Sequence, residues 1–126
     1  MNGVVKRTKQ PMPTFEPGDV IKVPFPYLST PAKQYRPALV ISSPELQEVH
    51  GRLWVLMITS AHNKGWSGDV EIPHPQEAGL PAPSVVRCAK IATIESSAAT
   101  RIGVLRQAQF RLVSNMMQRA LGANPG

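Results

Sequence analysis

Apolar and polar positions alternate in short segments along most of the chain, which is the spacing of half-buried strands. Residues 19–24 read Asp-Val-Ile-Lys-Val-Pro after a Pro-Gly turn, and residues 69–72 read Asp-Val-Glu-Ile. Continuous apolar runs, such as Leu39-Val40-Ile41, indicate strands that are buried on both faces. Together these segments predict four or five short strands, within residues 19–24, 39–41, 53–59, 69–72 and 84–94.

Polar and turn-forming residues separate these segments. Residues 27–35 contain Ser, Thr, Pro, Lys and Gln without a hydrophobic period, and they predict a polar loop. Residues 44–47 look like one helical turn, residues 63–68 like a loop, and residues 74–83 like a longer connection with three prolines.

The last segment of the chain has a helical period. Its apolar positions are Phe110, Val113, Met117, Ala120 and Leu121, and Gly122 follows as a stop signal. We expect a helix over about residues 107–121. Short strands followed by one amphipathic helix predict a mainly β fold, a small curled antiparallel barrel that the helix covers on one side.

A length of 126 residues allows one domain with a modest core. Residues 1–13 are basic and contain two prolines, so we expect a flexible N-terminal arm, followed by a single domain over residues 14–122. The net charge is +6, and no acidic residue follows Glu95. Such a charge suits contact with nucleic acid or with an acidic protein segment, but it also suits a plain solvated surface.

Other features narrow the class of protein. Cys88 is the single cysteine and cannot form an internal disulfide, and the three histidines stand apart without the spacing of metal ligands. We therefore expect no metal and no cofactor. No apolar run approaches the roughly 20 residues of a membrane span, and no secretory signal is visible, so a cytoplasmic protein is expected.

Several short motifs follow one another in an order that resembles the MazF/PemK (Kid-like) family of type II toxin-antitoxin endoribonuclease toxins, over about residues 15–121. These motifs are Pro17-Gly18-Asp19-Val20, Arg36-Pro37-Ala38-Leu39-Val40-Ile41, Ile58-Thr59-Ser60, Ala78-Gly79-Leu80, Ser84-Val85-Val86-Arg87-Cys88 and Ile102-Gly103. The resemblance implies an SH3-like barrel of the CcdB/PemK type with a C-terminal helix. It also implies a homodimer that cleaves single-stranded mRNA at short motifs, and a cognate antitoxin whose acidic tail covers the RNA groove.

Cleavage of RNA without a metal uses the 2′-hydroxyl as nucleophile and needs a proton acceptor, a proton donor and a cation that stabilises the phosphorane. Arg36 follows the polar loop and opens a strand, where a rigid sheet would hold its planar fork toward a phosphate. An arginine at a barrel edge can instead form a structural ion pair. The resemblance implies that Arg36 lies in the active site.

Thr59 and Arg87 are the other two catalytic candidates. The resemblance implies that Thr59 pairs with the active-site arginine, although a plain strand threonine is the alternative. Arg87 matches an arginine of the PemK/Kid branch, but it can also neutralise Glu95 or Glu71 within the barrel. Two positions depart from that branch, because Ala89 stands where it has an aspartate and Thr30 where it has a histidine.

The expected RNA contacts come from two loops. They are Ser29, Thr30, Lys33, Gln34, Ser60, Lys64 and Trp66. Trp66 with Lys64 combines an aromatic face with a positive charge, which can stack a base and hold its phosphate, or can serve a dimer contact. Trp54 lies within a strand and is expected in the core, and His62 is a reserve acid or base.

Two other functions fit the same fold. One is a non-enzymatic toxin that resembles CcdB and acts on DNA gyrase through the C-terminal helix. The other is a degenerate RNA-binding module, which the alanine at position 89 favours.

Overall fold

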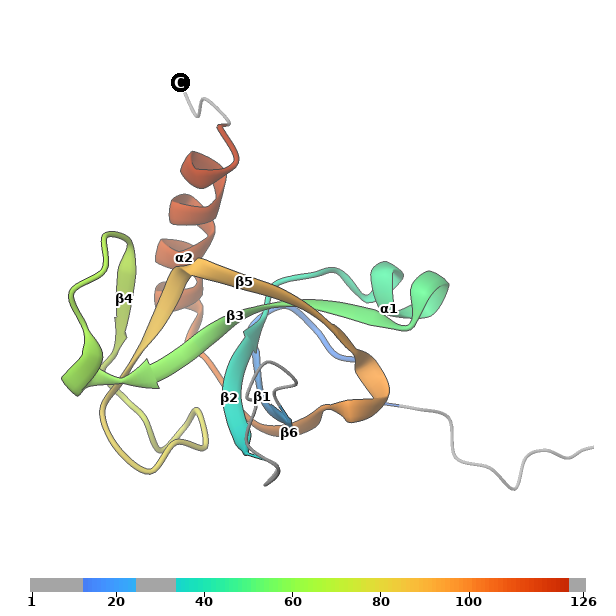
Figure 1. Cartoon of the computed structure of the whole chain (residues 1–126), viewed down its shortest axis with the longest axis horizontal. Coiled ribbons are helices and arrows are strands. Elements are labelled where there is room, and N and C mark those ends of the chain that lie inside the picture. Colours follow the sequence, from blue (N-terminus) through green and yellow to red (C-terminus); the bar gives the residue numbers. More distant parts are fainter. Residues whose placement is uncertain (1–12, 25–33, 123–126) are drawn as a thin grey trace, which may run out of the picture.

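A curled six-stranded antiparallel sheet, with the strand order β4-β5-β3-β2-β1-β6, forms the body of the protein (Figure 1). The computed structural model describes residues 13–24 and 34–122. The strands are β1 (Asp19–Pro24), β2 (Tyr35–Val40), β3 (Arg52–Ser60), β4 (Asp69–Ile72), β5 (Ser84–Glu95) and β6 (Thr100–Val104). The helices are α1 (Pro44–His50) and α2 (Gln107–Ala120), with short 3-10 turns η2 (Ala61–Asn63) and η3 (Ser96–Ala98).

The predicted fold class is confirmed, a mainly β half-barrel with a C-terminal helix. All five predicted strands are present, and α2 spans Gln107–Ala120 where residues 107–121 were expected. Two predictions were wrong in detail. Tyr35, expected in a loop, begins β2, and β6 was not predicted at all. The five residues of β6 are exposed or only half-buried, so they lack apolar alternation, and pairing with β1 rather than burial defines the strand.

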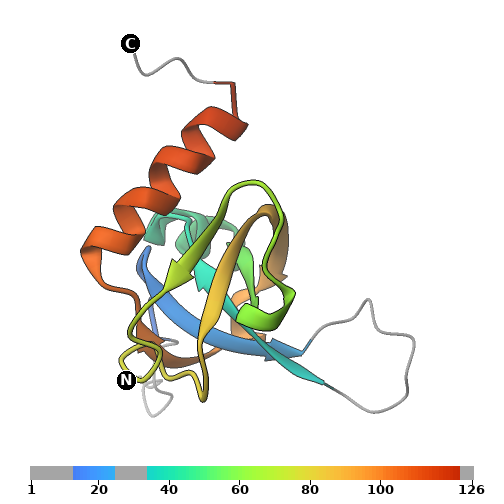
Figure 2. The same cartoon turned by 90° about the vertical axis from the view of Figure 1, so that its left-hand side faces the viewer.

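The two faces of the sheet carry separate apolar clusters. Along β3, Leu53, Val55 and Met57 belong to the cluster inside the curl, whereas Leu56 and Ile58 belong to the cluster beneath α2. Figure 2 shows α2 along one side of the sheet, with β1 and β2 running from that side to the opposite end. The alternation of β3 thus builds a core on each face. No helix in the described ranges has the length and hydropathy that a membrane crossing requires.

Trp54 was expected in the core, and this prediction was wrong. The residue is 47% exposed. Trp54 lies between Leu53 and Val55 of the cluster inside the curl, so its side chain is on the opposite face of the sheet. There it lines a pocket beside the short helix α1, together with Ile41 and Leu46. The longer helix α2 covers other parts of that face. An apolar run therefore predicts the strand correctly but does not show which of its residues a helix will cover.

Gly79 lies in the loop before β5 and allows this loop to approach β6 closely. Its φ is positive, at 73°. A Cβ atom there would collide with the backbone carbonyl of Ile102. Gly51 has a similar φ of 65°, but a Cβ atom there would meet nothing within 4 Å. We expect Gly79→Ala to reduce the free energy of unfolding by about 1 to 3 kcal/mol more than Gly51→Ala does, because only the first adds a backbone clash. Urea unfolding of both variants measures the difference, and equal losses would contradict it.

Candidate functional site

Arg87 of β5 is the centre of a buried polar network. Its Nε donates to Oδ1 of Asp69 at 3.2 Å and its Nη2 donates to Oδ2 at 3.0 Å. The antiparallel register of β4 and β5 places these two residues opposite each other. Their side chains are 10% and 8% exposed, so the pair is largely shielded from water. A fork geometry of this kind fixes both side chains strongly.

The same pair holds the loop between β3 and β4. Asp69 also accepts hydrogen bonds from the backbone N–H groups of Gly65 and Trp66, each at 3.2 Å. Arg87 donates to the backbone carbonyl of Asn63, and the Asn63 side chain donates to Oγ1 of Thr59 at 3.0 Å. Two predicted site residues, Thr59 and Arg87, are therefore joined through Asn63, a residue that the sequence did not single out.

The electrostatics of the network favour the ionised carboxylate. The Arg87 hydrogen bonds, with the loop N–H groups, hold the pKa of Asp69 below its usual range, against the opposing effect of burial. The acidic partner of Arg87 is Asp69, rather than Glu95 or Glu71, the two acids considered from the sequence. Glu95 lies 4.0 Å from Arg52 and Glu71 lies 3.7 Å from Lys64. Asp69 was missed because it looks like the polar position of an alternating strand.

Arg36 has a different environment. It is the second residue of β2, pairs with Val23 of β1, and is exposed. Within residues 13–24 and 34–122 it forms no ion pair, so the structural alternative for this arginine finds no acidic partner there. Its guanidinium is therefore available to a ligand, whereas that of Arg87 is largely occupied.

The three catalytic candidates share one face of the sheet. Ala38 lies opposite Met57, and Met57 lies opposite Arg87. Arg36 and Thr59 each stand two residues from this row, and side chains two residues apart point to the same face. In the described part of the chain no hydrogen bond joins Arg36 to Thr59, whose hydroxyl accepts from Asn63 instead. The fold brings the three residues to one face without direct contact between Arg36 and Thr59.

The expected RNA contacts fall into three groups. Ser29, Thr30 and Lys33 lie outside the described residues, and Gln34 is exposed just before β2. The Ser60 hydroxyl accepts from the backbone N–H of His62 at 3.2 Å and so caps η2. Lys64 and Trp66 are exposed on the following loop.

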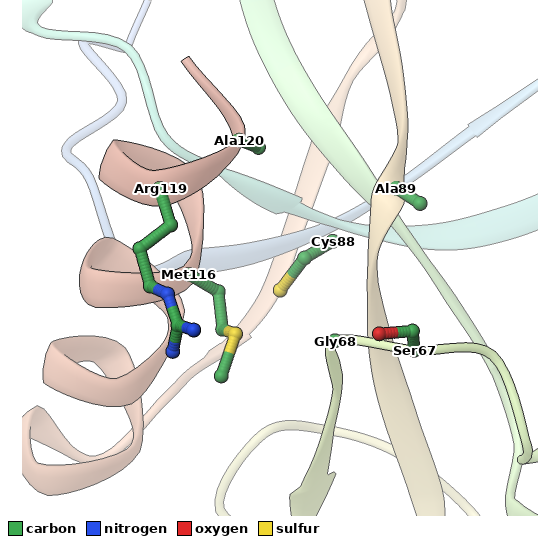
Figure 3. Close-up of a pocket in the computed structure, with 7 residues that line it drawn as sticks. All are labelled: Ser67, Gly68, Cys88, Ala89, Met116, Arg119 and Ala120. Carbon is green, nitrogen blue, oxygen red and sulfur yellow. The ribbon is translucent and has the colours of Figure 1, made fainter. Parts of the chain in front are cut away.

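A pocket of about 570 Å³ lies between α2 and β5 (Figure 3). Its lining residues are Ser67, Gly68, Cys88, Ala89, Met116, Arg119 and Ala120. The Cys88 side chain belongs to the cluster beneath α2, so it points to the opposite face from its neighbour Arg87. In Figure 3 the Cys88 sulfur points across the pocket toward the helix that carries Met116 and Arg119. Ala89 also borders this pocket, but in Figure 3 its side chain points away from the helix.

Burial, with a smaller contribution from the charge of Asp69, raises the pKa of the Cys88 thiol to about 11. A thiol reacts through its thiolate, so Cys88 should be inert at neutral pH. We expect native protein to react with iodoacetamide at pH 8 about two orders of magnitude more slowly than free cysteine. Mass spectrometry of the time course measures this. A reaction rate equal to that of the urea-unfolded chain would contradict the prediction.

The donor groups needed for a metal site do not gather in the described ranges, where no three His, Cys, Asp or Glu side chains lie close enough to hold an ion. What the arrangement offers is an exposed arginine, a strand hydroxyl, and a loop fixed by a buried ion pair. Such groups can bind and stabilise an anionic phosphate.

Comparison with known proteins identifies a family that the chain matches. The family described as the PemK-like, MazF-like toxin of type II toxin-antitoxin systems matches residues 16–121. No curated protein sequence matches the chain at a significant level.

Solved structures share the fold at low identity. The MazE–MazF complex (Form-II) of Deinococcus radiodurans is 21% identical with a TM-score of 0.69, over 88% of this chain and 98% of that one. The Mycobacterium tuberculosis toxin MazF-mt6 is 20% identical with a TM-score of 0.67, over 84% and 98%. A mycobacterial endoribonuclease in complex with its cognate antitoxin is 16% identical with a TM-score of 0.70, over 91% and 100%.

Proposed function

The chain belongs to the PemK-like, MazF-like toxin family of type II toxin-antitoxin systems, and on this premise we propose that it is a metal-independent endoribonuclease. Its substrate is single-stranded mRNA, which it cuts at short motifs. This cleavage inhibits translation and growth. The 2′-hydroxyl attacks the adjacent phosphorus, the bond to the 5′-oxygen breaks, and the products are a 2′,3′-cyclic phosphate and a free 5′-hydroxyl. The mRNA substrate and the cleavage are proposals for this chain.

The observation that carries the proposal is the exposed guanidinium of Arg36, which has no ion pair within residues 13–24 and 34–122 and lies on the face that also holds Thr59. A guanidinium stays charged at physiological pH and meets two phosphate oxygens at once. We assign to Arg36 the stabilisation of the charge that develops on the phosphorane. Thr59, fixed by Asn63, is assigned to contact the phosphate.

Arg87 takes a supporting role in this proposal. Its Nε and Nη2 are already bound to Asp69 and Asn63. It therefore positions the loop between β3 and β4 beside Thr59 rather than meeting the reacting atoms. The contacts proposed for Ser29, Thr30, Lys33, Gln34, Ser60 and Lys64 position the RNA strand.

The test is incubation of the purified protein with a long single-stranded RNA in EDTA, followed by mapping of the new ends. We expect fragments with 2′,3′-cyclic phosphate and 5′-hydroxyl ends, and growth arrest on overexpression in cells. An RNA that stays intact, together with harmless overexpression, would overturn the proposal. Growth arrest that persists in Arg36→Ala but needs α2 would favour a CcdB-like toxin acting on DNA gyrase.

A partner and an assembly are part of the proposal. We propose a homodimer in the cytoplasm and a cognate antitoxin with an acidic tail. Support comes from the net charge of +6 and from the fold shared with the MazF of a MazE–MazF complex. Co-purification with the product of a neighbouring reading frame, and the mass of the protein in solution, test these two points.

A second function has a specific observation in its favour. Ala89 replaces the aspartate of the PemK/Kid branch and lines the pocket beside α2, and Arg87 is bound to Asp69. Neither residue supplies a proton acceptor to the face of Arg36. A protein that binds RNA without cutting it would fit these positions, and RNA binding without new ends in the same assay would identify it.

A further inference from the structure

A groove of about 370 Å³ lies between the short helix α1 and the start of β3. Trp54 lines it on the face of the sheet opposite the cluster inside the curl. Arg36, in contrast, stands two residues from Ala38, which belongs to that cluster. The groove is therefore separate from the candidate site around Arg36, on the other face of the sheet.

The helix that forms one wall of the groove is anchored from its far side. The buried Gln47 side chain accepts from the N–H of Phe15 at 2.9 Å and donates to the carbonyl of Pro13 at 2.7 Å. At the end of α1, the N–H of Gly51 donates to the Gln47 carbonyl, and the Gly51 carbonyl accepts from the N–H of Ser96. A helix of seven residues is marginal by itself, so these bonds fix α1 and make the groove a preformed one.

Ser42 brings an unpartnered hydrogen-bond donor to the groove that it helps to line. The residue is 5% exposed, and its Oγ accepts from the backbone N–H of Trp54 at 3.1 Å. The proton of this hydroxyl has no acceptor within residues 13–24 and 34–122. A buried hydroxyl without an acceptor costs free energy, because water would otherwise satisfy it. A ligand in the groove that carries an acceptor would complete the bonding of Ser42.

The other lining groups define the rest of the ligand. Trp54 and Val49 are 47% and 65% exposed, and with Ile41 and Leu46 they offer an aromatic face and aliphatic surface to a flat ring. Glu45 is exposed at the rim and forms no ion pair in the part of the chain that the structure describes. Its carboxylate accepts from N–H groups and disfavours an anionic ligand.

We propose that the groove between α1 and β3 binds a small, flat, neutral aromatic carboxamide. Its ring lies on Trp54, its carbonyl accepts from the Ser42 hydroxyl, and its amide N–H group donates to Glu45. A volume of about 370 Å³ with an apolar lining and few polar groups is typical of small-molecule sites. This site goes beyond the proposed nuclease and does not depend on it.

The test is an NMR titration of the full ¹⁵N-labelled chain with indole-3-carboxamide. We expect the indole N–H signal of Trp54 to shift saturably, with a Kd of about 0.1 to 1 mM for a ligand of this size. Trp54→Ala should weaken binding by about tenfold or more. Ile91→Ala removes another exposed apolar side chain outside the groove and should bind as the unaltered protein does.

The role of Ser42 is tested with a second ligand. 3-Methylindole keeps the ring but has no carboxamide, so it should bind the unaltered protein at least threefold more weakly than indole-3-carboxamide does. Ser42→Ala should weaken binding of the carboxamide about threefold to tenfold and leave that of 3-methylindole unchanged. Indole-3-carboxylate should bind more weakly than the amide, because it brings a negative charge to Glu45.

Several results would overturn the site. These are the absence of saturable shifts at millimolar carboxamide, equal affinities of Trp54→Ala and Ile91→Ala, or equal affinities of the carboxamide and 3-methylindole for the unaltered protein. A Trp54 signal that moves with protein concentration alone would show that a second copy of the chain covers the groove, and would also overturn it. Thermal unfolding checks the fold of each variant, and the two-ligand comparison decides the role of the carboxamide if Ser42→Ala does not fold.

Discussion

Replacing Asp69 by alanine is expected to reduce the free energy of unfolding by about 3 to 5 kcal/mol, because it leaves the buried Arg87 guanidinium without its counter-charge. The pair is bidentate and about nine-tenths buried. The same change also releases the loop N–H groups of Gly65 and Trp66. Urea unfolding at neutral pH, followed by circular dichroism, measures the loss.

Glu71→Ala is the matched control for this prediction. It removes a carboxylate from the same strand, two residues away, whose partner Lys64 lies at 3.7 Å. Both side chains of that pair are mainly exposed, so we expect a change of about 1 kcal/mol or less. Similar losses for Asp69→Ala and Glu71→Ala would show that the buried pair contributes no more than a surface pair.

The dependence of stability on pH follows from the same carboxylate. The folded protein lowers the pKa of Asp69, so the ionised group stabilises the fold above the unfolded-state pKa, near the ordinary value of 3.8. This contribution is lost as the pH falls through the folded-state pKa. Asp69→Asn should therefore be less stable than the unaltered protein at pH 7 and should lose less stability on acidification to pH 2, as thermal unfolding across that range would reveal.

The strands were predictable because their burial follows a period of two. The two apolar clusters alternate along β3, and that alternation is visible in the sequence. The sequence did not show which residues near the ends of strands are covered by a helix or a neighbouring strand. Trp54 is exposed because a short helix lies beside it, and β6 is a strand because of its pairing with β1. Both depend on contacts between residues far apart in the chain.

The partner of Arg87 shows the same limit within the candidate site. Glu71 and Glu95 were equally reasonable from the sequence, since each lies in or near a strand. The register of β4 and β5 selects Asp69, which is 18 residues away, by placing it directly opposite. Local pattern identifies an arginine in a strand, but only the register determines its counter-charge.

Asn63 and Arg36 differ in how far the sequence reveals them. Arg36 was identified from its place at a loop-to-strand junction and lies exposed at the start of β2. Asn63 carries no motif, yet its carbonyl accepts from Arg87 and its amide donates to Thr59. Residues that act through the backbone of a loop leave no spacing pattern to detect.

Arg36→Ala is expected to slow RNA cleavage by about a hundredfold to a thousandfold, as the loss of one preorganised group that stabilises transition-state charge does in other enzymes. Arg36 is exposed and unpaired among the described residues, so the change should leave the free energy of unfolding within about 0.5 kcal/mol. Single-turnover cleavage of an RNA that contains a mapped site measures the rate, and thermal unfolding measures the fold.

Two variants make this result specific to the fork of Arg36. Arg36→Lys keeps the charge but loses the planar pair of donors, so we expect a rate between those of the unaltered protein and Arg36→Ala. Arg52→Ala removes another exposed arginine, at the far end of β3 from Thr59, where the side chain is 4.0 Å from Glu95. It lowers the net charge equally and should cleave at the unaltered rate. If Arg52→Ala loses as much activity as Arg36→Ala, the positive charge serves general attraction to RNA and Arg36 has no special role in the reaction.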